Sequence, residues 1–118
     1  MEPKKRIVIA DDNKELCNLI MDVLSGHGYE VDSVYNGYEL LAYLKDLNPD
    51  VVILDLMMPE KDGLSIFDTI KQLSPYSRII IYTGYQEYQD SVYARRADRF
   101  LIKGADVDSL VSAVNELA

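Results

Sequence analysis

Residues 51–59 read Val-Val-Ile-Leu-Asp-Leu-Met-Met-Pro, and this stretch decides the fold. Four apolar residues, three of them β-branched, run directly into Asp55, and Pro59 and Asp62-Gly63 then break the backbone. A short apolar run bounded by turn residues is typical of a strand buried on both faces. Asp55 is therefore expected where a central strand ends, at the edge where open α/β sheets bind ligands. On this stretch alone, a loop-capping role for Asp55 is the alternative.

Similar apolar runs on both sides of this stretch predict four further strands. The expected strands span residues 6–10, 29–34, 51–54, 78–82 and 99–102, and helical apolar spacing predicts helices over residues 14–25, 38–47, 64–73, 86–96 and 107–117. Strands that alternate with helices favour a parallel sheet covered on both faces, with right-handed crossovers. We expect one α/β domain over residues 1–118, with residues 1–4 as a loose lead-in.

Composition narrows the class of protein. The 118 residues are 48% hydrophobic and 27% charged, as in a globular protein that is soluble in water. No apolar run is long enough to span a bilayer, and no secretory signal is recognisable at the start. Cys17 is the only cysteine, which excludes an intrachain disulfide and favours a reducing compartment. We expect a cytoplasmic protein without membrane contact.

The charge balance also restricts the partners. Twenty acidic side chains against twelve basic ones give a net charge of −8. Nucleic-acid-binding domains carry the opposite sign, so direct nucleic-acid binding by this domain is not expected. An excess of carboxylates favours hard cations wherever several of them converge.

Four of the expected strands end at residues that suit one chemical site. Asp11-Asp12 follow the first strand, Asp55 the third, Thr83 the fourth and Lys103 the fifth. Because the carboxyl ends of parallel strands lie at one edge of the sheet, these side chains are expected to meet in one cleft.

The charges of this cleft predict a metal ion. Two carboxylates about 4 Å apart repel by roughly 4 kcal/mol at an effective dielectric constant of about 20. Three carboxylates against one lysine leave a negative charge that a divalent cation can balance, and oxygen ligands suit Mg²⁺, with Mn²⁺ as a further option. A cation beside a carboxylate, a lysine and a hydroxyl points to phosphoryl chemistry, in which the carboxylate attacks phosphorus.

Taken in order, these motifs resemble the receiver domain of bacterial two-component response regulators, nearly from end to end. The matching pieces are Asp11-Asp12, Asp55, Met58-Pro59, Asp62-Gly63, Thr83-Gly84 and Lys103. The resemblance implies a flavodoxin-like (βα)5 sandwich, with a five-stranded parallel sheet in the order 2-1-3-4-5 and helices on both faces. It implies a phosphorylation-controlled signalling switch rather than an enzyme acting on other molecules.

The resemblance also implies roles for the acidic residues. Asp55 accepts a phosphoryl group from a phosphohistidine on a sensor histidine kinase or a histidine phosphotransfer protein. Asp12, Asp55 and the backbone carbonyl of Met57 hold Mg²⁺ directly, and Asp11 acts mainly through a bound water.

A second group of residues would pass the signal on. Lys103 pairs with the phosphoryl oxygens, and Thr83 donates a hydrogen bond to one of them. Phe100 occupies the family's switch-aromatic position, although a plain core role fits it equally. Movement of Thr83 and Phe100 would reshape the surface of the fourth helix, fifth strand and fifth helix, which is also a candidate homodimer interface. Three arginines near this surface, Arg95, Arg96 and Arg99, fit either a solvated face or ion pairs across a dimer.

The sequence departs from the family pattern at three positions. Gly104 follows Lys103 where the family usually has a cis proline, so this loop is expected to be more mobile. Met57 and Tyr85 occupy the positions that line access to the phosphoryl group, and neither carries a carboxylate or an amide. A weakly assisted attacking water and a long-lived acyl phosphate are therefore expected.

Other functions remain open at this point. An aspartate-nucleophile phosphatase of the haloacid dehalogenase type needs an acid two residues after the nucleophile, where this chain has Met57. A flavin-binding electron carrier needs a hydroxyl-rich phosphate loop where Asp11-Asp12 stand. A degenerate receiver that only binds proteins is the third alternative, and the tyrosines near residues 82–93 could form an aromatic partner surface or simply a polar rim.

Overall fold

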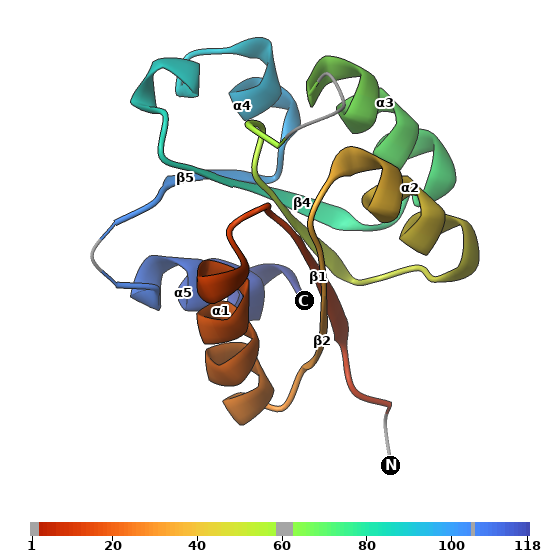
Figure 1. Ribbon diagram of the computed structural model, residues 1–118, viewed down its shortest axis with the longest axis vertical. Helices are drawn as coiled ribbons and strands as arrows, with labels where there is room; N and C mark the ends of the chain where they lie inside the picture. The colour runs from red at the N-terminus through yellow and green to blue at the C-terminus, as the bar shows by residue number, and fades with distance from the viewer. Residues whose placement is uncertain (1–2, 59–62, 105) are drawn as a thin grey trace.

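A computed structural model of the chain describes residues 3–58, 63–104 and 106–118. Its five strands form one parallel sheet in the order β2-β1-β3-β4-β5, which confirms the expected topology (Figure 1). The strands are β1 (Arg6–Ala10), β2 (Glu30–Val34), β3 (Val51–Leu54), β4 (Arg78–Thr83) and β5 (Arg99–Ile102). Two expected motif residues, Pro59 and Asp62, lie outside the described residues, as does the tip of the lead-in at residues 1–2.

Helices cover both faces of this sheet, as expected. They are α1 (Lys14–Gly26), α2 (Gly37–Asp46), α3 (Gly63–Leu73), a 3-10 turn η1 (Gln86–Tyr88), α4 (Val92–Arg96) and α5 (Asp108–Leu117). The helices α1 and α5 lie on one face, and α2, α3 and α4 lie on the other (Figure 1). No helix in the described parts of the chain is both long enough and apolar enough to cross a bilayer.

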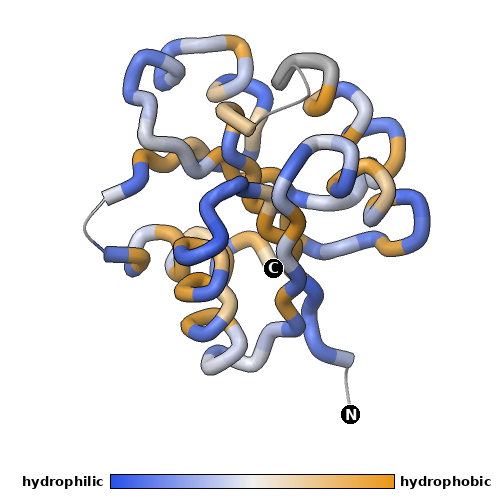
Figure 2. The backbone as a smooth tube through the Cα atoms, in the orientation of Figure 1, coloured by the Kyte–Doolittle hydropathy of each residue, from blue (hydrophilic) through white to orange (hydrophobic). Residues whose placement is uncertain are grey.

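The central strand β3 is buried on both faces. Val52 and Leu54 pack into the core beneath α2 and α3, while Val51 and Ile53 pack into the core beneath α1 and α5. Figure 2 shows the hydrophobic stretches gathered at the centre of the molecule and hydrophilic loops around them. The continuous apolar run in the sequence is thus explained by two separate cores that share one sheet.

The first helix shows one departure from the expected apolar stripe. Cys17, Ile20 and Leu24 form its fully buried face, but Leu19 is 51% exposed although it belongs to the predicted stripe. Each helical residue turns by about 100°, so Leu19 points away from the side that Ile20 buries. The helix ends as predicted, with His27 exposed beyond its last turn and Gly28 at a φ of 93°.

The predicted fourth helix over residues 86–96 is wrong in its extent. The structure has the short turn η1 and a five-residue α4, separated by a break before Val92. Ser91 causes the break because its hydroxyl donates to the carbonyl of Tyr88 and accepts from the N–H of Ala94 at 3.4 Å. A serine that binds nearby backbone groups favours a helix start over a helix interior.

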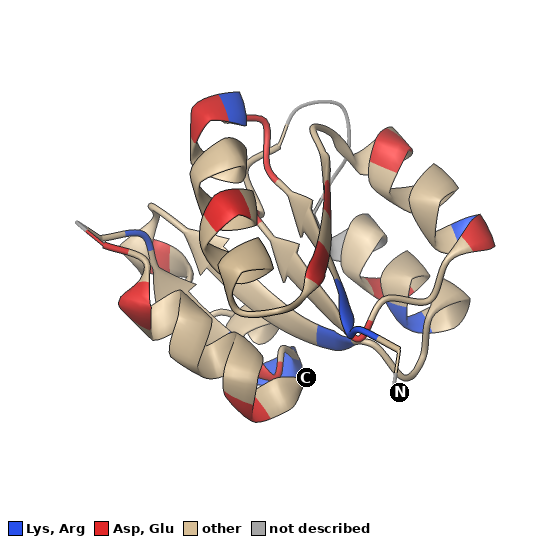
Figure 3. Cartoon of the chain, turned by 90° about the horizontal axis from the view of Figure 1, so that it is seen from below, with Lys and Arg blue, Asp and Glu red and all other residues tan. Residues whose placement is uncertain are grey.

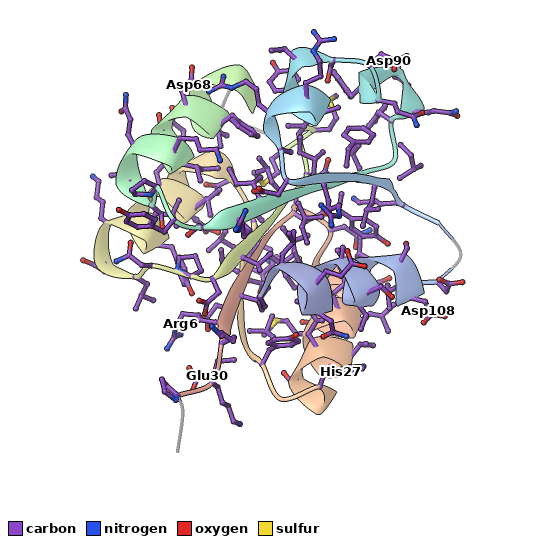
Figure 4. The ribbon with its side chains drawn as sticks, turned by 180° about the vertical axis from the view of Figure 1, so that it is seen from behind. Arg6, His27, Glu30, Asp68, Asp90 and Asp108 are labelled. Carbon is purple, nitrogen blue, oxygen red and sulfur yellow. The ribbon has the colours of Figure 1, made fainter. Side chains whose placement is uncertain are left out.

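The short α4 is tied to its neighbour by an arginine. Arg96 forms an ion pair with Asp68 of α3 at 2.6 Å, and its guanidinium lies 5.0 Å from the centre of the Phe67 ring. Figure 4 shows Asp68 on α3, at the same end of the molecule as Asp90, which precedes α4. These contacts compensate for the few backbone hydrogen bonds that a five-residue helix can make.

The amino-terminal edge of the sheet carries a polar network that joins β1, β2 and α2. Arg6 lies 2.8 Å from Glu30, and Figure 4 labels both residues at this edge. Arg6 also lies 3.0 Å from Asp32, and the Tyr43 hydroxyl donates to Asp32 at 2.8 Å. Burial, together with the bond to Asp32, raises the pKa of Tyr43 to about 12. The network holds the amino-terminal ends of β1 and β2 together. The candidate site lies at the opposite, carboxyl-terminal edge of the sheet.

Cys17 yields the first prediction. Burial, aided by the nearby charge of Asp11, raises the pKa of its thiol to about 11, so about one thiol in a thousand is ionised at pH 8. Iodoacetamide should therefore label the folded chain far more slowly than the chain unfolded in urea, as followed by intact mass. Equal labelling rates in the two states would contradict the burial of Cys17.

Candidate functional site

A cleft of about 450 Å³ opens at the carboxyl edge of the sheet. Its lining residues come from four loops: Asp11, Asp12 and Asn13 after β1, Asp55 and Met57 after β3, Gly84 and Tyr85 after β4, and Lys103 after β5. Figure 3 shows the acidic stretch between the end of β1 and the start of α1. The sequence prediction that these strand ends share one cleft is confirmed for all three acids and for the lysine.

The sheet itself positions the two buried acids. The β1 and β3 strands run in register from Ile7 opposite Val51 to Ala10 opposite Leu54, so Asp11 and Asp55 leave the sheet side by side. The Asp55 N–H still donates to the Ala10 carbonyl at 3.0 Å, which extends the ladder by one residue. Both carboxylates are therefore carried by backbone that is hydrogen-bonded into the sheet, since the Asp11 N–H also donates to the Val34 carbonyl at 3.1 Å.

A local turn fixes one oxygen of each buried carboxylate. Asp11 Oδ1 accepts from the N–H of Asn13 at 2.9 Å, and Asp55 Oδ1 accepts from the N–H of Met57 at 3.0 Å. An aspartate that binds the backbone two residues further on forms an Asx turn. The Oδ2 atom of each carboxylate is left to interact across the cleft.

Lys103 occupies the space between these two oxygens. Its Nζ lies 2.7 Å from Asp11 Oδ2 and 3.0 Å from Asp55 Oδ2, and its backbone N–H donates to the Thr83 carbonyl at 2.8 Å. Burial lowers the pKa of Lys103, but its hydrogen bonds to the two carboxylates outweigh that effect, so the pKa is raised above its ordinary value. The ammonium group is an internal counter-ion for the acids.

Three carboxylates meet closely enough to hold a metal ion. Asp11, Asp12 and Asp55 each offer an oxygen, and these oxygens lie within 4.8 Å of one another. Asp11 and Asp55 are buried, whereas Asp12 is exposed, so a bound ion would keep contact with water. This oxygen-only donor set fits Mg²⁺ or Mn²⁺, since small hard cations retain several waters.

Thr83 and Phe100 lie beside the cleft without lining it. Thr83 is fully buried, and its hydroxyl accepts a hydrogen bond from the N–H of Tyr85 at 3.3 Å. Phe100 is partly buried on β5, in register with Ile81 of β4, and packs against the core beneath α2 and α3. The switch roles expected for both residues stay predictions.

Met57 and Tyr85 both line the cleft, while their expected role in controlling access to a phosphoryl group stays a prediction. Met57 and Tyr85 each contribute to the cleft and are each 44% exposed. Gly104 is exposed, and a side chain at that position would meet nothing within 4 Å, so packing leaves room for a larger residue there. The proposed extra mobility of this loop stays a prediction.

Two features of the site were missed from the sequence. Asn13, whose side chain caps α1 by accepting from the N–H of Leu16, also lines the cleft. Tyr88 reaches Met57 with its hydroxyl, 3.3 Å from the sulfur. Clustered tyrosines were the only sequence signal for this contact, and they did not specify a partner.

Comparison with known proteins agrees with this geometry. The family model for the response regulator receiver domain matches residues 7–115. The chain is 34% identical over 106 residues to the transcriptional regulatory protein ZraR of Salmonella typhimurium, covering 88% of this chain and 24% of ZraR. It is 29% identical to the regulatory protein TrcR of Mycobacterium tuberculosis, covering 95% of this chain and 44% of TrcR. The chain thus spans less than half the length of these relatives.

Solved structures show the same fold. The response regulator TrrA of Thermotoga maritima, in complex with Mg²⁺-BeF, superposes with a TM-score of 0.89 at 33% identity, over 97% of this chain and 99% of TrrA. TrrA in its complex with the histidine kinase ThkA gives a TM-score of 0.86 at 34% identity, over 96% of this chain and 97% of TrrA.

The lysine between the carboxylates yields the second prediction. Lys103→Met should lower the free energy of unfolding by about 1–3 kcal/mol, because two buried carboxylates lose their counter-ion. Asp12→Asn should shift it in the opposite direction, because one of three mutually repelling charges is removed. Urea titrations without divalent cations measure both. An unchanged stability of the Lys103 variant would show that the ion pairs contribute nothing net.

Proposed function

The chain belongs to the receiver-domain family of two-component response regulators, and on this basis we propose that Asp55 is its phosphoacceptor. The position of Asp55 carries the proposal: it ends the central strand, one carboxylate oxygen is fixed by Met57, and the other faces Lys103 in an open cleft. A nucleophile must be held in place and yet be reachable, and Asp55 meets both demands.

The proposed reaction is phosphoryl transfer from a phosphohistidine. A carboxylate oxygen of Asp55 attacks phosphorus, the new O–P bond forms, and the P–N bond to the donor histidine breaks. The Lys103 ammonium, now 3.0 Å from Asp55 Oδ2, is near enough to move onto a phosphoryl oxygen as charge leaves the carboxylate. Asp55 is the only group that the chain phosphorylates or dephosphorylates, which separates this function from that of a phosphatase acting on other molecules.

The acidic cluster supports a requirement for Mg²⁺, with Mn²⁺ as a substitute. Asp11, Asp12, Asp55 and the backbone carbonyl of Met57 would hold the ion, Asp11 mainly through a water. When bound, the cation neutralises phosphoryl oxygens during transfer. The residues of the chain supply the remainder: Asp55 is the nucleophile, and Lys103 provides a second positive charge.

The switch is proposed to run through Thr83 and Phe100. The Thr83 hydroxyl would leave its bond with the Tyr85 N–H and donate to a phosphoryl oxygen, and the Phe100 ring would move into the vacated space. Because phenylalanine has no hydroxyl, any change at position 100 must act through packing alone. The surface of α4, β5 and α5 would then change its affinity for partners.

A histidine kinase or a histidine phosphotransfer protein is the proposed donor. TrrA, which shares this fold at 34% identity, was solved with the kinase ThkA. We propose that residues 1–118 form one receiver domain and lie in the cytoplasm. The net charge of −8 argues against nucleic-acid binding by this domain itself.

A homodimer through α4, β5 and α5 would need apolar contacts more than arginine bridges. Arg96 is paired with Asp68 and Arg99 with Glu116, at 2.6 and 2.9 Å, and Arg95 donates to the backbone carbonyl of Asp90 at 3.3 Å. The exposed Val92 and Ile102 on this face remain for a second copy.

The third prediction tests the phosphoacceptor. Incubation with acetyl phosphate and Mg²⁺ should add one phosphate to the native chain and none to Asp55→Asn, because an amide oxygen is a far weaker nucleophile than a carboxylate. Intact mass reads out both proteins, and Asp50→Asn serves as a matched control that should still be phosphorylated. A phosphate-sized gain in Asp55→Asn, or none in the native chain, would overturn the assignment.

The fourth prediction concerns the lifetime of the phosphorylated form. Met57 and Tyr85 line the cleft but offer no side-chain carboxylate or amide to orient an attacking water, so the acyl phosphate should persist for minutes or longer in Mg²⁺. Loss of the phosphate mass after removal of the donor gives the rate. Decay within seconds would be incompatible with an unassisted water.

A further inference from the structure

Tyr88 joins the two loops that face each other across the cleft. Met57 stands on the loop after β3, and Tyr85 stands on the loop after β4. The Tyr88 hydroxyl, three residues beyond Tyr85, donates to the Met57 sulfur at 3.3 Å. This side-chain hydrogen bond therefore links segments that are 31 residues apart in the sequence.

The Tyr88 ring is itself well fixed. It packs edge-on against Tyr85 and Tyr93, with ring centres 6.3 and 6.2 Å apart, and it contacts the core beneath α2 and α3. Its backbone N–H donates to the Tyr85 carbonyl at 3.2 Å, and its carbonyl accepts from the Ser91 hydroxyl. Edge-to-face pairs of this kind favour one ring orientation, so the hydroxyl is presented from a rigid base.

Met57, by contrast, depends on an anchor. A methionine side chain rotates about three bonds, and this one is 44% exposed at the mouth of the cleft. Asp55 fixes the backbone of Met57 by accepting from its N–H, but this bond does not restrain rotation of the Met57 side chain. Within the described part of the chain, the Tyr88 hydroxyl supplies a hydrogen bond that can restrain this sulfur.

We propose that Tyr88 is a positioning residue for turnover of the aspartyl phosphate, because it holds the Met57 thioether across the mouth of the cleft. The proposal rests on the proposed function of Asp55. In hydrolysis, a water oxygen bonds to phosphorus, the bond between phosphorus and the Asp55 oxygen breaks, and inorganic phosphate leaves. A thioether held beside that path excludes water from it, and a free one does not.

A double-mutant cycle isolates the hydroxyl–sulfur contact. The proteins are the native chain, Tyr88→Phe, Met57→Ala and the combination of both, with Tyr76→Phe as a matched control because Tyr76 is 95% exposed and lies at the amino-terminal end of β4. Each protein is loaded with acetyl phosphate and Mg²⁺, the donor is removed, and loss of phosphate is followed by intact mass. Thermal melting checks that every variant is folded.

Tyr88→Phe should accelerate loss of phosphate roughly 3-fold to 10-fold, the ratio that a net hydrogen bond of ordinary strength supports. Met57→Ala should accelerate it at least as much, the added Tyr88→Phe change should then have no further effect, and Tyr76→Phe should match the native chain. The proposal for Tyr88 alone is overturned if Tyr88→Phe loses phosphate at the native rate. It is also overturned if Tyr88→Phe accelerates the loss equally in the native chain and in Met57→Ala. If Asp55→Asn also gains phosphate, or the native chain gains none, the proposed function itself fails and this inference fails with it.

The methionine methyl signals give a second readout that does not depend on phosphorylation. The chain has four methionines, and the Met57 methyl group is bonded to the sulfur that accepts from the Tyr88 hydroxyl. In spectra of chain labelled at the methionine methyl groups, Tyr88→Phe should move and narrow the Met57 signal, whereas Tyr76→Phe should leave it in place. An unmoved Met57 signal in Tyr88→Phe would show that the thioether is not held by this contact.

Discussion

The positive charge of Lys103 between two buried carboxylates is the interaction on which the site depends. Register pairing of β1 and β3 forces Asp11 and Asp55 together, and Asp12 adds a third charge within 4.8 Å. Such crowding costs several kcal/mol unless a cation offsets it. The lysine offsets part of this cost, at 2.7 and 3.0 Å, and leaves an excess of negative charge in an open cleft. That excess is the reason why we propose a divalent cation at this site.

The same crowding links rigidity to function. Asp11 and Asp55 follow strands that are buried on both faces, so close packing opposes any separation of their backbones that would relieve the repulsion. The loops that follow β3 and β4 hold Met57, Tyr85 and Tyr88. In the proposed function, the sheet therefore carries the reacting groups, and the loops would control access to them.

Much of this arrangement could be predicted from the sequence, because it depends on strand order and on where strands end. The run before Asp55 specified a central strand, and parallel pairing then brought Asp11, Asp12 and Lys103 to the same edge. Contacts between side chains of different loops could not be predicted in this way. The break at Ser91 and the hydroxyl of Tyr88 on Met57 depend on local hydrogen bonds that no periodic pattern encodes.

A crystal structure of the chain with Mg²⁺ and beryllium fluoride would test the central claim most directly. The account predicts beryllium bonded to a carboxylate oxygen of Asp55, the Lys103 ammonium on a fluoride, and the metal ion among Asp11, Asp12 and Asp55. Beryllium on another carboxylate, or Lys103 still bridging Asp11 and Asp55 with the cluster free of metal, would contradict it.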